Sequence, residues 1–95
     1  MRLVVLPAPG SGLQSMYVTG QLERLFVHLG YYANAFDLAY VTWGDPEEEA
    51  RLWKPFSDQT GAQLVHASRR QAALRRAHVV RCMNLSAART ALPSL

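Results

Sequence analysis

Residues 1–30 change from an unbroken apolar run to a helical stripe. Residues 2–6 (Arg-Leu-Val-Val-Leu) show no alternation and are partly β-branched, which predicts a strand buried on both faces in a parallel sheet. After a Pro- and Gly-rich turn over 7–12, a helical pattern begins at about Gln14. Its apolar positions share one helix face: Val18, Leu22, Leu25, Phe26 and Leu29. We expect Gly30 to cap this helix, with His28 in the last turn complementing the helix dipole.

A second strand is predicted over 36–42, followed by the best-defined helix start in the chain. Residues 43–44 form the turn, Asp45 is the N-cap and Pro46 takes the first helical position. The run 47–49 consists of three glutamates, which suit the positive end of the helix dipole. Acid catalysis or metal binding by this run is disfavoured because consecutive residues point to different helix faces. We therefore interpret the run as capping and solvation.

The rest of this helix is expected to bury one face and to end near Gly61. Ala50, Trp53 and Phe56 supply the expected buried face. Pro55 is expected to kink the helix or to end its regular part.

The last third of the chain repeats the strand and helix alternation twice. Residues 62–67 predict a third strand, and Ser68 to Gln71 form a Ser-x-x-Gln capping box for a helix that runs to about Ala77. Residues 78–83 predict a fourth strand. A final helix is then expected, with Asn84 and Ser86 as its two possible N-caps. This helix stops in the closing Pro-Ser-Leu.

Strand and helix alternate four times, which predicts an α/β fold with right-handed crossovers and an open parallel sheet of about four strands. We expect a Rossmann-like strand order of three, two, one, four, with the ligand corner at the carboxyl ends of the first and fourth strands. At 95 residues the chain is a single domain or the truncated N-terminal half of a larger doubly wound domain.

Composition excludes several classes of protein. No apolar run approaches the length of a membrane span, and the apolar start is too short for a signal peptide. The single cysteine, Cys82, excludes an internal disulfide and a multi-cysteine metal site. The expected location is the cytoplasm, with peripheral contact at a membrane left open.

The net charge of +3 is unevenly distributed. All acidic residues lie between Glu23 and Asp58, and no acid follows Gly61 to balance six arginines: Arg69, Arg70, Arg75, Arg76, Arg81 and Arg89. These arginines either contact phosphate or nucleic acid, or form a solvated surface whose acidic neighbours belong to another segment. Nucleic acid is not expected as a partner, because no Phe, Tyr or Trp follows Phe56 to stack on bases.

The loop between the first strand and the first helix is the main candidate for ligand binding. Gly10, Ser11 and Gly12 lie where a strand, a glycine turn and a helix start form the phosphate-binding corner of many α/β domains. The loop matches neither a P-loop, because Leu13 stands at the lysine position, nor the full dinucleotide pattern, because Ser15 replaces the third glycine. The glycines either bind an anion or only make a tight turn.

Polar residues at the other strand ends are the remaining site candidates. His66 near the end of the third strand is the candidate catalytic base, with a structural histidine as the alternative. Asn84 and Ser86 follow the fourth strand and would bind substrate. The spacing predicts no catalytic triad and no zinc site, and no metal or cofactor is expected.

Together these segments resemble the N-terminal Rossmann-like domain of GT-B glycosyltransferases. The resemblance rests on 2–6, on the glycine loop before a helix that ends in Leu29-Gly30, on the strand 38–42, and on the tract 77–88, which in that family runs from a strand into a loop and a small-residue helix. It implies sugar transfer from a nucleotide-sugar donor to an acceptor, in a cleft between two domains.

By position, the resemblance gives the donor-diphosphate loop to Gly10, Ser11 and Gly12, and the acceptor side to His66, Asn84 and Ser86. A chain of this length lacks the C-terminal domain that grips the donor, so it should not catalyse transfer alone, and whether it is an enzyme stays open. Two alternatives remain: a small nucleotide- or phosphate-binding module with a degenerate P-loop, and an interaction module that forms a homo-oligomer through its sheet edges.

Overall fold

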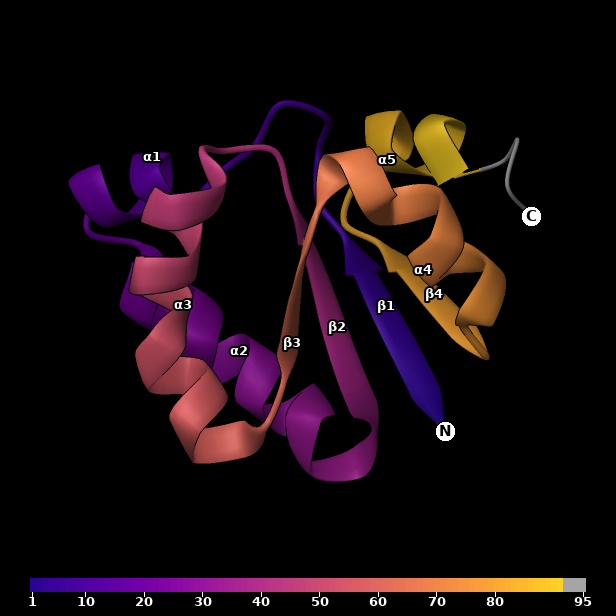
Figure 1. Cartoon of the computed structure of the whole chain (residues 1–95), viewed down its shortest axis with the longest axis horizontal. Coiled ribbons are helices and arrows are strands. Elements are labelled where there is room, and N and C mark those ends of the chain that lie inside the picture. The colour runs from indigo at the N-terminus through magenta and orange to yellow at the C-terminus, as the bar shows by residue number, and fades with distance from the viewer. Residues whose placement is uncertain (92–95) are drawn as a thin grey trace.

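The computed structural model describes residues 1–91 as a four-stranded parallel sheet with helices on both faces (Figure 1). The strands are β1 (Arg2–Leu6), β2 (Asp37–Thr42), β3 (Gln63–His66) and β4 (Val79–Cys82). The helices are α1 (Leu13–Val18), α2 (Leu22–Ala35), α3 (Pro46–Thr60), the 3-10 turn η1 (Ala67–Arg69), α4 (Arg70–Arg76) and α5 (Leu85–Ala91). The strand order is β3-β2-β1-β4. The predicted α/β class and Rossmann-like strand order are confirmed.

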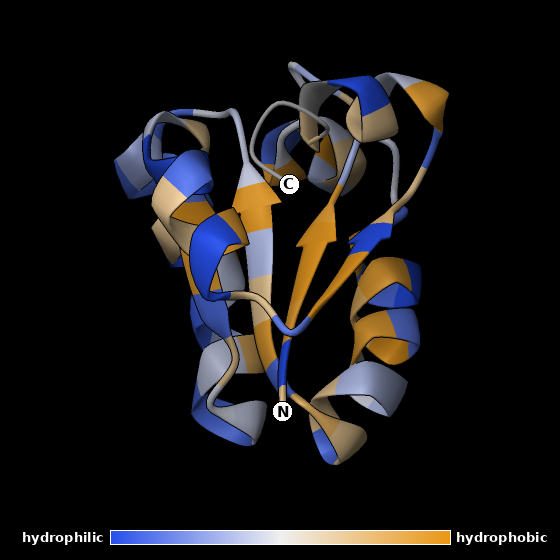
Figure 2. Cartoon of the chain, turned by 90° about the vertical axis from the view of Figure 1, so that its right-hand side faces the viewer, coloured by the Kyte–Doolittle hydropathy of each residue, from blue (hydrophilic) through white to orange (hydrophobic). Residues whose placement is uncertain are grey.

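Alternate residues of the two central strands face two separate cores. The core on the α1–α3 side contains Leu3, Val5, Leu38 and Tyr40 with Leu13, Leu25, Leu29, Trp53 and Phe56. The core on the α4–α5 side contains Val4, Leu6, Ala39 and Val41 with Ala67, Leu74, Ala87 and Ala91. Figure 2 shows the hydrophobic strands lying between the two helix layers. Burial on both faces explains why β1 is an unbroken apolar run.

The predicted first helix is two helices, and its predicted end at Gly30 is wrong. The chain turns at Gly20, whose φ of +76° lies in the left-handed region, and α2 then starts afresh at Leu22. Gly30 lies inside α2, which continues to Ala35 because side chains beyond the glycine, such as Tyr32, still pack on the core. His28 is therefore in the middle of α2, where it is exposed.

Helix α3 begins as predicted, but Pro55 does not end it. The Asp45 carboxylate accepts a hydrogen bond from the Glu48 amide at 3.1 Å, and Pro46 occupies the first turn. The helix runs through Pro55 to Thr60 and closes at Gly61, whose φ is +74°. Packing of the face that contains Trp53 outweighs the hydrogen bond that a proline within a helix removes.

Trp53 joins α3 to the sheet and to α2. Its ring stacks on Tyr40 at 5.5 Å and meets Phe26 and Phe56 edge-on at 5.7 and 5.0 Å. Its indole N–H donates to the Ala62 carbonyl at 3.0 Å. The polar end of this buried ring therefore has a hydrogen-bond partner, and the contacts of Trp53 fix the position of α3 on the sheet.

In the last third of the chain the strands match the prediction to within a residue at each end, but the capping box is wrong. Ser68 lies in η1, and α4 begins at Arg70 without a side-chain cap. Asn84 does cap α5, because its side-chain oxygen accepts a hydrogen bond from the Ala87 amide at 2.8 Å. The predicted stop at 93–95 lies outside the described residues. Within 1–91 no helix is both long and apolar enough to cross a membrane.

Candidate functional site

Four loops meet at the carboxyl edge of the sheet, because all four strands are parallel (Figure 1). Backbone bonds tie neighbouring segments together at this edge. The Trp43 amide donates to the Ser11 carbonyl, and the Met83 amide donates to the Leu6 carbonyl, both at 3.0 Å. The glycine loop after β1 is therefore fixed to the loop after β2.

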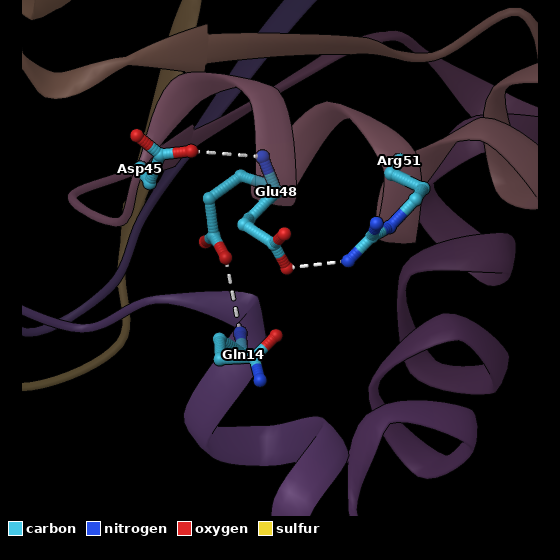
Figure 3. A network of polar contacts seen from close by, with 5 residues as sticks. Gln14, Asp45, Glu48 and Arg51 are labelled. Atoms are coloured by element: carbon cyan, nitrogen blue, oxygen red, sulfur yellow. Dashed lines mark hydrogen bonds and ion pairs between the residues drawn. The ribbon is translucent and has the colours of Figure 1, made fainter.

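Glu49 is the most deeply buried charged residue at this edge, with 0% of its surface exposed. Its carboxylate accepts hydrogen bonds from the Leu13 amide, from the Gln14 amide at 3.0 Å, and from the Thr42 hydroxyl. The Gln14 contact is drawn in Figure 3 beside the Asp45 cap and the exposed Glu48–Arg51 pair. A single side chain from α3 thus binds the start of α1 and the end of β2.

This carboxylate occupies the Leu13 and Gln14 amides, which directly follow the candidate loop of Gly10, Ser11 and Gly12. Gly12 and Gly44 pack directly against it: a Cβ at Gly12 would lie 3.0 Å from the Glu49 Oε1 atom, and one at Gly44 would lie 2.5 Å from its Cδ. Gly10 has a φ of +84°, and a Cβ added there would meet nothing within 4 Å, as expected of a turn glycine. At the start of α1 the anion is one that the chain supplies itself.

His66 fastens the end of β3 to the loop after β2. Its Nε2 lies 3.1 Å from the Gly44 carbonyl oxygen, to which it donates. Its Nδ1 accepts from the Ser68 amide at 3.2 Å and lies 2.9 Å from the Ser68 hydroxyl. These partners fit the neutral imidazole protonated on Nε2, and both ring nitrogens are engaged.

A hollow of about 460 Å³ lies between the start of α3 and the end of β3. It has an apolar part and a polar part, and the residues that line it are Thr42, Pro46, Glu49, Ala50, Leu64, Val65, His66, Ser68 and Arg69. This mixture of an apolar floor and a few hydrogen-bonding groups is typical of a site for a small organic ligand.

The structure separates His66 from the other two residues of the predicted acceptor side. His66 ends β3, whereas Asn84 and Ser86 follow β4, at the opposite end of the strand order. Three strand spacings amount to about 14 Å. The side-chain oxygen of Asn84 is engaged in capping α5, and Ser86 is exposed in the first turn of that helix. One compact site does not contain all three residues.

Glu49 is the residue that sequence reasoning missed. Ala50 was expected on the buried face of α3 and is exposed, whereas Glu49 is buried with Trp53 and Phe56. The signal was present, because 49, 53 and 56 follow the i, i+4, i+7 spacing of one helix face. A glutamate in the first turn of a helix is usually solvated, so the predicted capping and solvation role is wrong for Glu49.

Tyr40 is affected by the same buried carboxylate. Burial raises the pKa of its hydroxyl from 10.0 to about 12, and the nearby charge of Glu49 adds to the rise. The folded protein holds this proton more tightly than the unfolded chain does. The contribution of this group to the free energy of unfolding is therefore fully present below about pH 10 and is lost as the pH rises towards 12.

We therefore expect the stability of the parent protein to fall more steeply in alkali than that of Tyr40→Phe. Between about pH 9 and about pH 11 the parent should lose about 1 kcal/mol more free energy of unfolding than the variant. Urea unfolding at each pH measures the difference. Parallel pH profiles for the two proteins would show that the hydroxyl is not perturbed.

In the described range 1–91, no cluster of three or more His, Cys, Asp or Glu side chains is placed to hold a metal ion. Cys82 is half-buried in β4 and is not part of such a group. Comparisons with protein-family models, with curated proteins and with solved structures found no match to this chain.

Proposed function

We propose that this chain is the acceptor-side part of a glycosyltransferase and does not transfer sugar by itself. The observation that carries the proposal is the hollow of about 460 Å³ beside His66, at the carboxyl edge where open α/β sheets bind ligands. The Ser68 hydroxyl and the Arg69 guanidinium can bond to sugar hydroxyls, while Pro46, Ala50 and Leu64 provide apolar lining. The proposed reaction, transfer of a sugar from a nucleotide-sugar donor to an acceptor, follows from the resemblance to GT-B enzymes.

The position of Glu49 favours an acceptor role over donor binding. A diphosphate at the start of α1 would compete with the Glu49 carboxylate for the Leu13 and Gln14 amides, and the two anions would repel each other. The same argument weighs against the alternative of a nucleotide- or phosphate-binding module. In this proposal a further domain holds the nucleotide sugar.

His66 has a positioning role in this proposal. Both of its ring nitrogens already have partners in the loops at the carboxyl edge, so it holds Ser68, which lines the hollow, next to the loop that contains Gly44. The proposal names no catalytic residue.

The test is an NMR titration of the isotope-labelled 95-residue chain with uncharged mono- and disaccharides and, separately, with uridine and guanosine diphosphate sugars. We expect saturable shifts of the backbone amides of residues 64–69 with a saccharide. Arg69→Ala should weaken this binding about tenfold, through the loss of a charge-assisted hydrogen bond. Arg75→Ala removes an exposed arginine that does not line the hollow, and should change binding less than twofold.

Two results would overturn the proposal. One is saturable binding of the diphosphate sugars at residues 10–14 without any response from the hollow. The other is no shift at residues 64–69 with any saccharide in the panel, from a chain that remains folded by circular dichroism.

A further inference from the structure

Within residues 1–91 no strand pairs with the outer edge of β4. β4 pairs with β1 in parallel, with Leu3 opposite Val79 and Val5 opposite Arg81. Within residues 1–91, β4 is the last strand on its side of the sheet. An edge strand of this kind presents unpaired backbone donors and acceptors, which can add a further strand.

The ladder shows which residues present these groups. The Met83 amide, directly after β4, donates to the Leu6 carbonyl at 3.0 Å, so Met83 directs its amide towards β1. Successive residues of a strand direct their amide and carbonyl groups to opposite sides, and in the register that pairs Leu6 with Cys82 this turns those of Val80 and Cys82 outward. These two residues would therefore bond to an added strand.

Apolar surface surrounds this edge. Val79 and Met83 are each 40% exposed, and Leu85 at the start of α5 is 81% exposed. A hollow of about 380 Å³ lies beside β4, lined by Leu3, Tyr32, Phe36 and residues 79–82. Side chains of an added strand would have a place to pack on the sheet face that α2 leaves uncovered.

The positive charge beside β4 indicates which kind of strand would bind there. Arg75, Arg76 and Arg81 are exposed, and the ion pairs among residues 1–91 do not include them: these are Arg2–Asp37, Arg51–Glu48 and Lys54–Asp58. The Arg81 guanidinium lies 5.5 Å from the centre of the Tyr32 ring, which holds it beside the strand edge. Positive charge at an open edge favours an acidic strand.

We propose that the outer edge of β4 binds an extended, acidic segment of a partner polypeptide as a fifth strand of the sheet. Backbone bonds at Val80 and Cys82 give affinity, and carboxylates next to Arg81 and the end of α4 give selectivity. Symmetric pairing with the β4 strand of a second copy is disfavoured, because it would bring two sets of these arginines together. This surface is separate from the hollow of the proposed acceptor site.

The experiment uses a blocked, fluorescent eight-residue peptide of alternating valine and glutamate, with the corresponding valine and lysine peptide as its control. Fluorescence anisotropy should detect binding of the acidic peptide alone, weakening as salt is raised. Arg81→Glu should weaken it at least tenfold. Arg24→Glu makes the same change of charge at an exposed site on α2, and should weaken it less than twofold.

A second variant tests the backbone contact. Val80→Pro removes an outward amide and leaves the β1 ladder intact, and an edge strand tolerates proline at such a position. It should abolish peptide binding while circular dichroism stays unchanged. The proposal fails if both peptides bind equally, if Arg24→Glu and Arg81→Glu have equal effects, or if sedimentation shows a dimer of the chain that Arg81→Glu strengthens.

Discussion

Glu49→Ala is expected to lower the free energy of unfolding by about 3 kcal/mol, the largest effect of any substitution considered for this protein. The side chain is fully buried, and its removal leaves the Leu13 and Gln14 amides and the Thr42 hydroxyl without their common acceptor. Each buried donor that loses its partner costs about 1–3 kcal/mol, and water entering from the adjoining hollow recovers part of that cost. Urea unfolding followed by circular dichroism measures the change.

The neighbouring glutamate provides the matched control. Glu47 stands in the same first turn of α3 and is exposed, so Glu47→Ala should change the free energy of unfolding by less than about 0.5 kcal/mol. Glu49→Gln keeps the shape but points a donor at a site surrounded by donors, and should recover only part of the loss. If Glu49→Ala proved as mild as Glu47→Ala, the carboxylate would not be what holds α1 to α3.

Gly44→Ala is expected to lower the free energy of unfolding by about 2 kcal/mol, because the added methyl group overpacks the space beside the buried Glu49 side chain. A Cβ at Gly44 would lie 2.5 Å from Cδ, 2.7 Å from Cγ and 2.8 Å from Oε1 of Glu49. The Glu49 side chain cannot move away without breaking its hydrogen bonds to α1 and β2. Chemical denaturation of the variant, monitored as for Glu49→Ala, gives the value.

A double-mutant cycle attributes this cost to the contact between the two residues. In the Glu49→Ala background, Gly44→Ala should cost less than about 0.5 kcal/mol, since the atoms with which it clashes are gone. Gly30→Ala is the reference for a glycine without close neighbours. Its Cβ would meet nothing within 4 Å inside α2, and alanine should stabilise the protein by about 0.5–1 kcal/mol. Additive losses in the double mutant would refute the proposed contact.

Gly10, Ser11 and Gly12 form the glycine corner for which the sequence suggests a phosphate ligand. The structure has the strand, the glycine turn and the helix start, but Gly12 packs against the Glu49 carboxylate of the same chain. A glycine pattern predicts that the backbone comes close to something. It does not reveal whether that is a ligand or a side chain.

Much of the fold could be predicted from the sequence. The unbroken apolar run of β1, the Asp45-Pro46 start of α3 and the left-handed Gly61 are local signals, because each depends on burial or backbone geometry within a few residues. The expected helix ends at Gly30 and Pro55 are wrong for the same reason. Both are poor helix residues, but α2 and α3 continue through them because their apolar faces pack on the sheet.

The sequence by itself determined the α/β class, the alternation of elements and the Rossmann-like strand order, since these follow from hydrophobic periodicity and the handedness of crossovers. Only the tertiary structure decided the chemistry of the carboxyl edge. Residue 49 meets residues 13 and 42 only when α3 packs beside α1, and His66 meets Gly44 only when β3 pairs with β2. Contacts between residues far apart in the chain depend on this packing, and no local pattern encodes them.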